Sequence, residues 1–400
     1  RVNVKPIFCF LSHKYYYEGP CRMAGGEALQ PGFDDILNGQ ISNGIQMGLK
    51  YACPEDVGTV MEANIVTVTD DWDMKDEYLE ALLKDQEKTD VYVIFTSFGS
   101  DRLWREFGRK CGKPVIIVPN LWNPMKSAYY FNTGVEVYTP YDWEEVTEYL
   151  KALRARKAIA RANVLLVTRF SDTMCVAGAD DGFYDLDLVT EKFGTKFRPV
   201  NFHELMDQMS PLPEEGNPTT PGRVTPNLTA EEIRELEDYA DQLMAEAEAC
   251  DISKEYLVNS LKAWKAVRKN MDAYDCSACA IPCPDLCSTR RLNQSKFTFC
   301  LCHQLNHENG VPSACKYDIA AALTMMAEIC LSKQVPYMAN TLPIIKSRNG
   351  SEQWITQIPE EDRKAIENTD NLYCVNMSPQ MRKTQGIDAP ADRFNIRHFA

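Results

Sequence analysis

The stretch VYVIFTSFGSDRLWREFGRKCGKPVIIVP (Val91–Pro119) decides the fold class. Its two ends, VYVIFT (Val91–Thr96) and PVIIVP (Pro114–Pro119), are short, rich in β-branched residues and apolar on both faces. Such runs are typical of buried strands in a parallel sheet. Between them, DRLWREFGRKCG (Asp101–Gly112) places apolar residues at intervals of three and four, so we expect a helix that covers the sheet. A strand, a helix and a second strand in this order predict an α/β protein.

The same alternation continues on both sides of this stretch. Two more strand-like runs precede it, PIFCFL (Pro6–Leu11) and NIVTVT (Asn64–Thr69). After it, a helical pattern over roughly Asp142–Ala160 leads to another apolar run, NVLLVT (Asn163–Thr168), where a second α/β domain is expected to begin. The sequence therefore predicts two open parallel sheets covered by helices.

The chain is expected to divide into an N-terminal α/β domain over residues 1–160 and a second α/β domain over residues 161–345. Within the second domain, residues 210–229 contain five prolines and almost nothing apolar, which predicts a long surface loop. Thr229 then precedes a long acidic helix, and a further helix is predicted over Ser253–Met271. Both helices are expected to pack outside the sheet.

Composition excludes several classes of protein. The 400 residues carry a net charge of −14, which opposes binding to nucleic acid or to an anionic membrane surface. No apolar run approaches the roughly 20 residues that a membrane-spanning helix needs, and the start lacks the pattern of a signal peptide. We therefore expect a cytoplasmic protein whose 15 cysteines are mostly buried, reduced thiols.

Polar residues follow two of the predicted strands of the first domain. Open parallel sheets bind ligands at the carboxyl ends of their strands, so the turn Ser97–Asp101 and the segment PNLWNP (Pro119–Pro124) are candidates to contact a ligand. In the second of these, Asn120 and Trp122 are predicted to bind substrate. The alternative for such turns is that a residue like Asp101 only caps the helix that follows.

The segment DCSACAIPCPDLCSTRRLNQSKFTFCLCH (Asp275–His303) is rich in cysteine. Its opening C-x-x-C is a spacing found in metal and redox sites. The later spacings, C-x-x-x-C and C-x-C, match neither structural zinc sites nor the common iron–sulfur runs. We therefore predict no bound metal, and we expect AIPC (Ala280–Cys283) and FTFCLC (Phe297–Cys302) to be buried strands.

On that interpretation, the polar residues Pro284–Gln294 form a loop that points from a strand end into a cleft. Arg290 and Arg291 could hold a carboxylate or phosphate there. The alternative is that they are surface arginines at the start of a helix.

The stretch NHENGVPSACKYDIAAALTMMAEICLSKQVPYMANT (Asn306–Thr341) contains the turn Ala314–Asp318, an apolar helix predicted over Ile319–Leu331, and a predicted strand PYMAN (Pro336–Asn340). It resembles the L-fucose and L-arabinose isomerase family, in which an A-C/T-E-x-D turn opens an apolar helix and a later strand ends in an acidic residue. The resemblance implies two α/β domains and a small C-terminal β-rich domain. Residues 346–400 would be the start of that last domain, which is expected to be truncated.

The resemblance also implies aldose–ketose isomerisation of a sugar through an enediol. In the family, the two acids bind Mn²⁺ beside the sugar's first two carbons, and here their positions are occupied by Lys316 and Asn340. A protonated lysine cannot bind a cation, and an amide oxygen is a weak ligand for Mn²⁺. The family's further histidine, expected near Val375–Pro379, has no match. The metal site is therefore predicted to be altered, with Asp318 and Glu308 near enough in sequence to form a shifted one.

Two functions are consistent with these residues. In an isomerase with a revised site, the ammonium group of Lys316 would stabilise the enediolate and Asp318 or Glu308 would act as base. In a non-catalytic sugar-binding relative, Lys316 would only form a salt bridge to one of those carboxylates. A redox or metal-storage role for the cysteines is a third alternative, and the resemblance implies a homo-oligomer. The predicted site residues are Lys316, Asp318 and Asn340 for catalysis and Asn120, Trp122, Arg290 and Glu308 for substrate binding.

Overall fold

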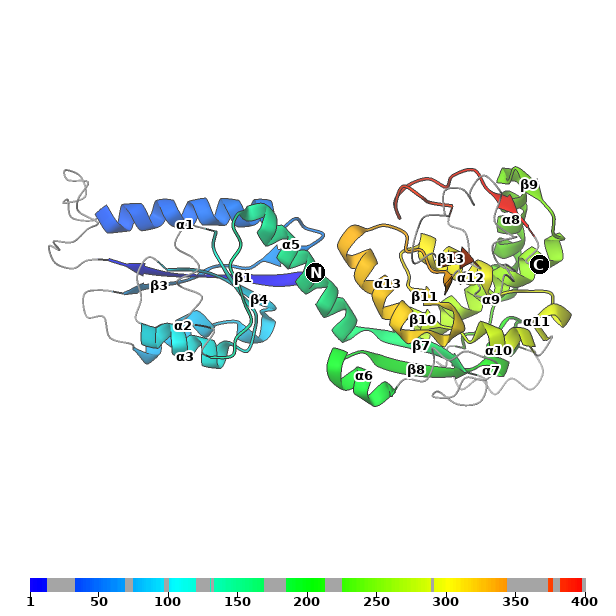
Figure 1. Ribbon diagram of the computed structural model, residues 1–400, viewed down its shortest axis with the longest axis horizontal. Coiled ribbons are helices and arrows are strands. Elements are labelled where there is room, and N and C mark those ends of the chain that lie inside the picture. The colour runs from blue at the N-terminus through cyan, green and yellow to red at the C-terminus, as the bar shows by residue number, and fades with distance from the viewer. Residues whose placement is uncertain are drawn as a thin grey trace, which may run out of the picture. The chain divides into compact units, whose positions relative to one another are not determined.

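The computed structural model describes residues 1–12, 33–68, 75–96, 101–119, 130, 133–168, 185–212, 225–288, 291–343, 373–376 and 382–397. The chain forms two compact units, Arg1–Lys157 and Ala158–Ala400. Each unit contains an open parallel sheet with helices packed on it (Figure 1), which confirms the predicted α/β fold with two parallel sheets.

The first unit is built on one parallel sheet, in which the described residues supply six strands. β1 is central, and β2 and β3 follow one another along the same edge of it. Across the sheet the strands are β2 (Gly58–Val60) and β3 (Asn64–Val68), then β1 (Val2–Leu11), β4 (Val91–Thr96), β5 (Val115–Ile117) and β6 (Val137–Tyr138).

Helices cover both faces of this sheet, which explains why its strands are apolar on both faces. In β4, Val93 packs into the core that α1 and α5 close, whereas its neighbour Ile94 packs into the opposite core with α2 and α3. The helices of the unit are α1 (Phe33–Ala52), α2 (Asp76–Leu83), a short 3₁₀ turn (Gln86–Lys88), α3 (Asp101–Cys111) and α5 (Trp143–Arg161), the last of which runs into the second unit.

The second unit contains a parallel sheet of four described strands in the order β11-β10-β7-β8. From β7 the chain forms β8 on one side and then crosses to β10 and β11 on the other. The strand order therefore reverses between β7 and β10, and open α/β sheets bind ligands beyond the carboxyl ends of strands at such a point. The strands are β7 (Asn163–Thr168), β8 (Lys196–Asn201), β10 (Ala278–Ala280) and β11 (Ser313–Ala314).

Two cores lie on the two faces of this second sheet. One contains residues of α9 and α12, such as Val267 and Cys302, and the other contains residues of α13, such as Met325. The helices that flank the sheet are α6 (Leu186–Phe193), α7 (Phe202–Gln208), α9 (Lys254–Ala273), α10 (Cys283–Ser288), α11 (Arg291–Gln294), α12 (Cys300–Glu308) and α13 (Ile319–Ser332).

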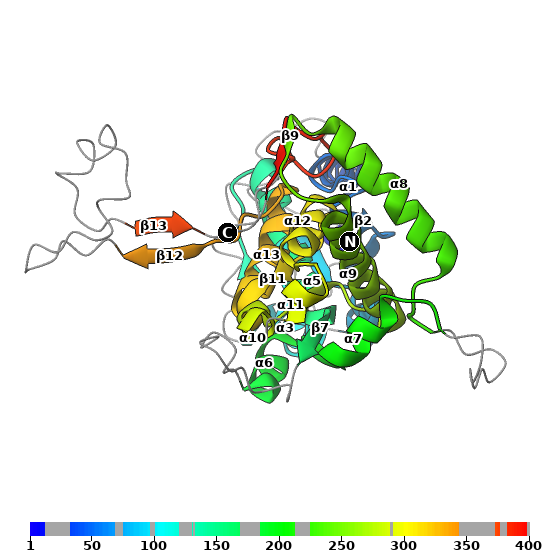
Figure 2. The same ribbon diagram turned by 90° about the vertical axis from the view of Figure 1, so that its right-hand side faces the viewer.

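A further helix, α8 (Ala230–Glu246), packs on the outside of α9 (Figure 2), through a separate apolar cluster that includes Leu243 and Leu261. Thr229 begins it with a capping box, because its hydroxyl accepts from the Glu232 amide at 3.1 Å and the Glu232 carboxylate accepts from the Thr229 amide at 2.8 Å. The helix start predicted at Thr229 is thus confirmed. Of the predicted loop over 210–229, residues 213–224 lie outside the described part of the chain.

Two predictions for the cysteine-rich segment are wrong, and a third, the strand Ala280–Cys283, holds only at Ala280, where β10 ends, since Cys283 already begins α10. FTFCLC is not a strand, because Cys300 begins α12, in which Cys302 and Leu305 are buried at helical spacing. The predicted loop Pro284–Gln294 is mostly helical, in α10 and α11. Short apolar runs do not distinguish a buried strand from a buried helix. The predicted strand Pro336–Asn340 also differs, since the strand begins only at Asn340.

The last described segments form two small sheets. β12 (Asn340–Pro343) pairs antiparallel with β13 (Tyr373–Asn376), as Figure 2 shows, and β14 (Asn395–Ile396) pairs with β9 (Ala249–Cys250). Residues 344–372 and 377–381 lie outside the described residues, so a separate C-terminal β-rich domain stays a prediction. Within the described residues, none of the helices combines the length and apolar character needed to span a bilayer.

Candidate functional site

The candidate site lies just beyond the carboxyl ends of β10 and β11 in the second unit. Backbone hydrogen bonds hold together the two segments that leave these strands: Ile281 N–H donates to the Ala314 carbonyl at 2.9 Å, and Tyr317 N–H donates to the Ile281 carbonyl at 3.1 Å. These bonds place Cys283, two residues past Ile281, against Cys315, which directly follows β11. The pairing of two short strands thus brings together two cysteines that are far apart in sequence.

Cys283, Cys315 and His303 form one cluster, which we call the Cys–His–Cys site. The Sγ of Cys283 lies 3.3 Å from Nε2 of His303, and the two sulfurs and a ring nitrogen all lie within 4.8 Å of one another. Cys283 begins α10, His303 lies in α12, and Cys315 starts a 3₁₀ turn (Cys315–Tyr317). Cys283 and His303 are buried and Cys315 is half-buried, so Cys315 is the most exposed residue of the three.

Ser313 orients the ring of His303 through Nδ1, the ring nitrogen that does not face Cys283. Its hydroxyl lies 2.8 Å from Nδ1 of His303 and 3.0 Å from the Sγ of Cys279, and it accepts from Nδ2 of Asn306 at 3.2 Å. A hydroxyl both donates and accepts, so Ser313 supports either tautomer of the ring. When Nδ1 carries the proton and donates it to Ser313, Nε2 presents a lone pair to the two cysteines.

The electrostatics of the site favour a thiolate at Cys315. The hydrogen bond from Cys283 is the largest influence, and together with the hydrogen bond and charge of His303 it outweighs burial and lowers the pKa of Cys315 to about 4. At Cys279 burial outweighs the lowering by the hydrogen bonds of Ser313 and Asn306 and by the charge of Arg268, and the pKa rises to about 11. A thiolate is the form of cysteine that binds metals and acts as a nucleophile, and the lowered pKa favours this form at Cys315.

The backbone of the turn is strained at two residues without a glycine. Lys316 and Tyr317 have φ angles of 57° and 60°, a left-handed conformation that costs non-glycine residues of order 1–3 kcal/mol each and that concentrates at functional sites. Tyr317 is buried in the core under α13, which anchors the turn. The side chain of Lys316 is half-buried and forms no ion pair with any described residue, Asp318 and Glu308 included.

Both carboxylates predicted beside Lys316 have partners of their own. Asp318 caps α13, because its Oδ1 accepts from the Ala321 amide at 2.8 Å. Glu308 forms a buried ion pair with Arg382, with the shortest contact, Nη2 to Oε2, at 2.7 Å.

The other predicted residues are only partly described. Asn340 begins β12 and pairs with Asn376 of β13, and its side chain lies outside the described part. The segment before it approaches the site, since the Cys315 amide donates to the sulfur of Met338 at 3.4 Å. Asn120, Trp122 and Arg290 lie outside the described residues.

The residues at the positions implied for manganese do not fit that ion. Lys316 supplies an ammonium group where a carboxylate would bind, and neither Asp318 nor Glu308 replaces it, since one caps a helix and the other pairs with Arg382. The donor atoms that converge beside Lys316 are sulfur and imidazole nitrogen, whereas Mn²⁺ prefers carboxylate oxygens.

A neighbouring histidine gives a pH-dependent prediction. His307 is buried and donates from Nε2 to the Ser313 carbonyl at 2.8 Å; burial, reinforced by the charge of His303, lowers the pKa of His307 to about 4. An unfolded histidine titrates near 6.5, so the unfolded state binds the extra proton first, and stability falls as the pH drops from about 6.5 to about 4. His307→Gln lacks this titrating group. Between pH 7 and pH 4.5, the free energy of unfolding of His307→Gln should therefore fall by about 2–3 kcal/mol less than that of the wild type.

The measurement is urea unfolding at the two pH values for both proteins. Other acid-sensitive groups, such as Glu308, are common to both and cancel in the difference. Equal losses in wild type and His307→Gln would contradict the assigned pKa.

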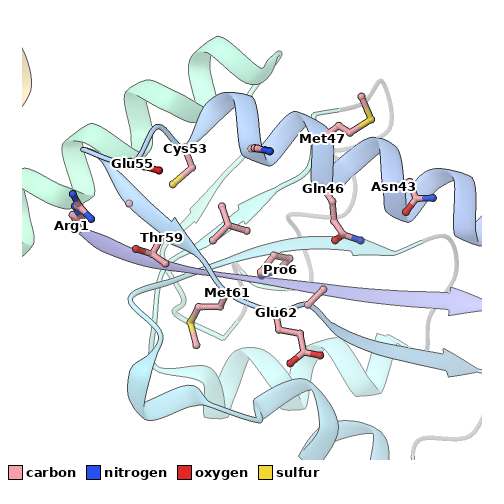
Figure 3. Close-up of a pocket in the computed structure, with 14 residues that line it drawn as sticks. Arg1, Pro6, Asn43, Gln46, Met47, Cys53, Glu55, Thr59, Met61 and Glu62 are labelled. Atoms are coloured by element: carbon pink, nitrogen blue, oxygen red, sulfur yellow. The ribbon is translucent and has the colours of Figure 1, made fainter.

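A concave feature lies in the first unit. A groove of about 1050 Å³ runs between α1 and the edge of the sheet, with Asn43 and Gln46 on the helix side and Thr59, Met61 and Glu62 on the strand side (Figure 3). The residues that end β1 and β4 do not line the groove. The groove therefore does not lie at the carboxyl ends of these strands, where parallel sheets bind ligands. The segments that follow those strand ends lie outside the described residues.

Comparisons with known proteins leave the chain without a family. No family model matches it, and no curated protein matches it. One similar solved structure is the apo form of a dinucleotide-forming acetyl-coenzyme A synthetase 1 from Ca. Korarchaeum cryptofilum, at 14% identity over 83% of this chain, with a TM-score of 0.21. This chain spans 65% of the length of that one. At so low a TM-score the likeness supports no conclusion about fold or function.

Proposed function

We propose that this chain is an aldose–ketose isomerase whose site lies at the carboxyl edge of the second sheet. The observation that carries the proposal is the turn after β11. It carries Cys315, whose pKa is lowered, and Lys316 at adjacent positions, in the turn that the sequence resemblance makes the active-site turn. The turn is strained and its base is fixed in the core, as expected of a site that holds charged groups in place.

Isomerisation requires a group that moves a proton and a group that stabilises negative charge. The proton leaves carbon 2 of the aldose and returns to carbon 1, while the hydroxyl proton on oxygen 2 is lost and oxygen 1 gains one. Lys316 is suited to stabilise the enediolate oxygen formed in between. Because Asp318 and Glu308 are engaged elsewhere, the Cys–His–Cys site is the better candidate for proton transfer.

Substrate contacts belong to the same proposal. The sugar would bind over the half-buried Cys315 side of the site, and Asn340 would approach it from the start of β12. Contacts through Asn120, Trp122 and Arg290 remain predictions, as does a homo-oligomer.

A non-catalytic sugar-binding protein is the second candidate. It is favoured by one observation, the engagement of both predicted carboxylates by a helix cap and an ion pair. A binder needs only hydrogen-bonding groups and would retain the edge of the sheet as a binding surface.

The test is a panel of aldoses incubated with the chain in D₂O and followed by NMR. An isomerase forms the ketose and incorporates deuterium at carbon 1 or carbon 2. A sugar that raises the melting temperature without deuterium incorporation would favour the binding protein. No incorporation and no thermal stabilisation by any sugar would contradict both.

A further inference from the structure

We propose that Cys283, His303 and Cys315 bind one zinc ion. The inference depends on the geometry of these three side chains and not on the isomerase, so either can fail without the other. It replaces the expectation, drawn from cysteine spacing, that this segment holds no metal.

The distances suit tetrahedral zinc. Bonds of about 2.3 Å to sulfur and about 2.0 Å to nitrogen put a sulfur and a nitrogen about 3.5 Å apart, and two sulfurs about 3.8 Å apart. Cys283 Sγ and His303 Nε2 are 3.3 Å apart, and all three ligand atoms lie within 4.8 Å. Small side-chain rotations therefore give the zinc geometry without moving the backbone.

The surroundings are those of a metal-binding histidine. Metal-bound imidazole donates its second N–H to a partner that fixes the ring, and His303 has such a partner in Ser313, 2.8 Å from Nδ1. Ser313 is in turn held by Asn306, and both are fully buried. Each ligand is also fixed by its backbone, because Cys283 and Cys315 leave paired strands and His303 lies in the middle of α12.

The donor set selects zinc and leaves it an open position. Two thiolates and an imidazole favour zinc over manganese, and their two negative charges balance the charge of Zn²⁺. Three protein ligands of the Cys₂His type are found in catalytic zinc sites, where water or substrate takes the fourth position and the bound water has a pKa of about 7. If the proposed isomerase is right, this water is the proton acceptor beside Lys316.

The experiment measures zinc in the full chain and in single variants. Wild type, loaded with zinc and freed of excess, should hold one zinc per chain by mass spectrometry of its metal content. Cys283→Ser and Cys315→Ser should each lower zinc affinity by more than 100-fold in competition with a chelator, and Ser313→Ala by about 10- to 100-fold. Cys330→Ser, which changes a half-buried thiol on α13 outside the site, should retain wild-type affinity.

Cobalt substitution provides a second readout that does not depend on affinity. Co²⁺ in the wild-type site should show thiolate charge-transfer absorption, and each single serine variant should lose about half of it. Circular dichroism identifies any variant that does not fold, and the remaining serine variant then decides.

Three results would overturn the zinc site: no zinc in the reduced wild type, equal zinc in wild type and both serine variants, or a Cys283–Cys315 disulfide that persists in reductant. Zinc binding without deuterium incorporation into any sugar would contradict the proposed isomerase function and still support the zinc site. Isomerisation by a wild-type chain that takes up no zinc when loaded would contradict the zinc site and support the isomerase.

Discussion

Lys316→Met is expected to lower kcat for aldose–ketose isomerisation by about 100- to 1000-fold, the usual effect of removing one group that stabilises a developing oxyanion. Methionine retains the length and apolar stem of the lysine and loses only the ammonium group. The left-handed backbone at this position, with φ 57°, is no more costly for methionine than for lysine, so the fold should be unaffected. Steady-state kinetics with the sugar identified by the deuterium experiment measure the effect.

The chain offers a matched control at the far end of α13, the helix that follows the turn of Lys316. Lys333 ends α13 with φ 56°, in the same left-handed conformation, and its side chain is exposed. Lys333→Met removes the same charge from the same backbone geometry, away from the Cys–His–Cys site, and should retain wild-type kcat. Similar kcat values for both variants, high or low, would contradict a catalytic role for the Lys316 ammonium group.

Glu308→Gln is expected to lower the free energy of unfolding by about 3–5 kcal/mol, because it leaves a buried arginine without its counter-charge. The carboxylate of Glu308 is 2% exposed and the guanidinium of Arg382 11%. Arg382 also lies over the ring of Phe394, with its Cζ 4.9 Å from the ring centre. The ion pair therefore ties residues 382–397 to α12, and urea unfolding monitored by circular dichroism measures its loss.

The control is an exposed ion pair in the same unit. Glu255 and Lys296 lie 2.6 Å apart with side chains 57% and 45% exposed, so Glu255→Gln should leave the free energy of unfolding nearly unchanged. The double variant Glu308→Gln with Arg382→Met should recover part of the loss, because it removes the unpaired charge as well. Equal stability of Glu308→Gln and Glu255→Gln would show that the Arg382 pair is not buried in solution.

This ion pair also predicts the direction of acid destabilisation. Burial alone would raise the pKa of Glu308, but the hydrogen bonds and charge of Arg382, with the hydrogen bond from Gln304, outweigh it and lower the pKa. The pair therefore stabilises the fold above the pKa of an unfolded glutamate, and that contribution is lost as the pH falls through the lowered value.

The sheets could be predicted from sequence because their strands are long enough to show a pattern. Val91–Thr96 was predicted with the bounds that the structure has, since its residues alternate between two apolar cores. Asn163–Thr168 was predicted equally well for the same reason. The fold class can therefore be predicted from short stretches of the sequence.

The Cys–His–Cys site could not be predicted in this way. The strands that assemble it, Ala278–Ala280 and Ser313–Ala314, have three and two residues, which is too short for any periodicity. The cysteine-rich segment ends at His303, and Cys315 lies beyond it, in the turn that the resemblance assigns to a different role. The one local signal was Cys283 and His303 in the same cysteine-rich segment, and assigning FTFCLC as a strand hid the helical position of His303.

The central claim is that the working site of this chain is the Cys–His–Cys site at the carboxyl edge of the second sheet. The most direct test compares the rate of deuterium incorporation into the sugar, in D₂O, for wild type, Cys315→Ser and Cys330→Ser. The account predicts that incorporation by Cys315→Ser falls by at least about 100-fold, while Cys330→Ser incorporates deuterium at the wild-type rate. Undiminished incorporation by a folded Cys315→Ser would contradict the account and place the chemistry elsewhere in the chain.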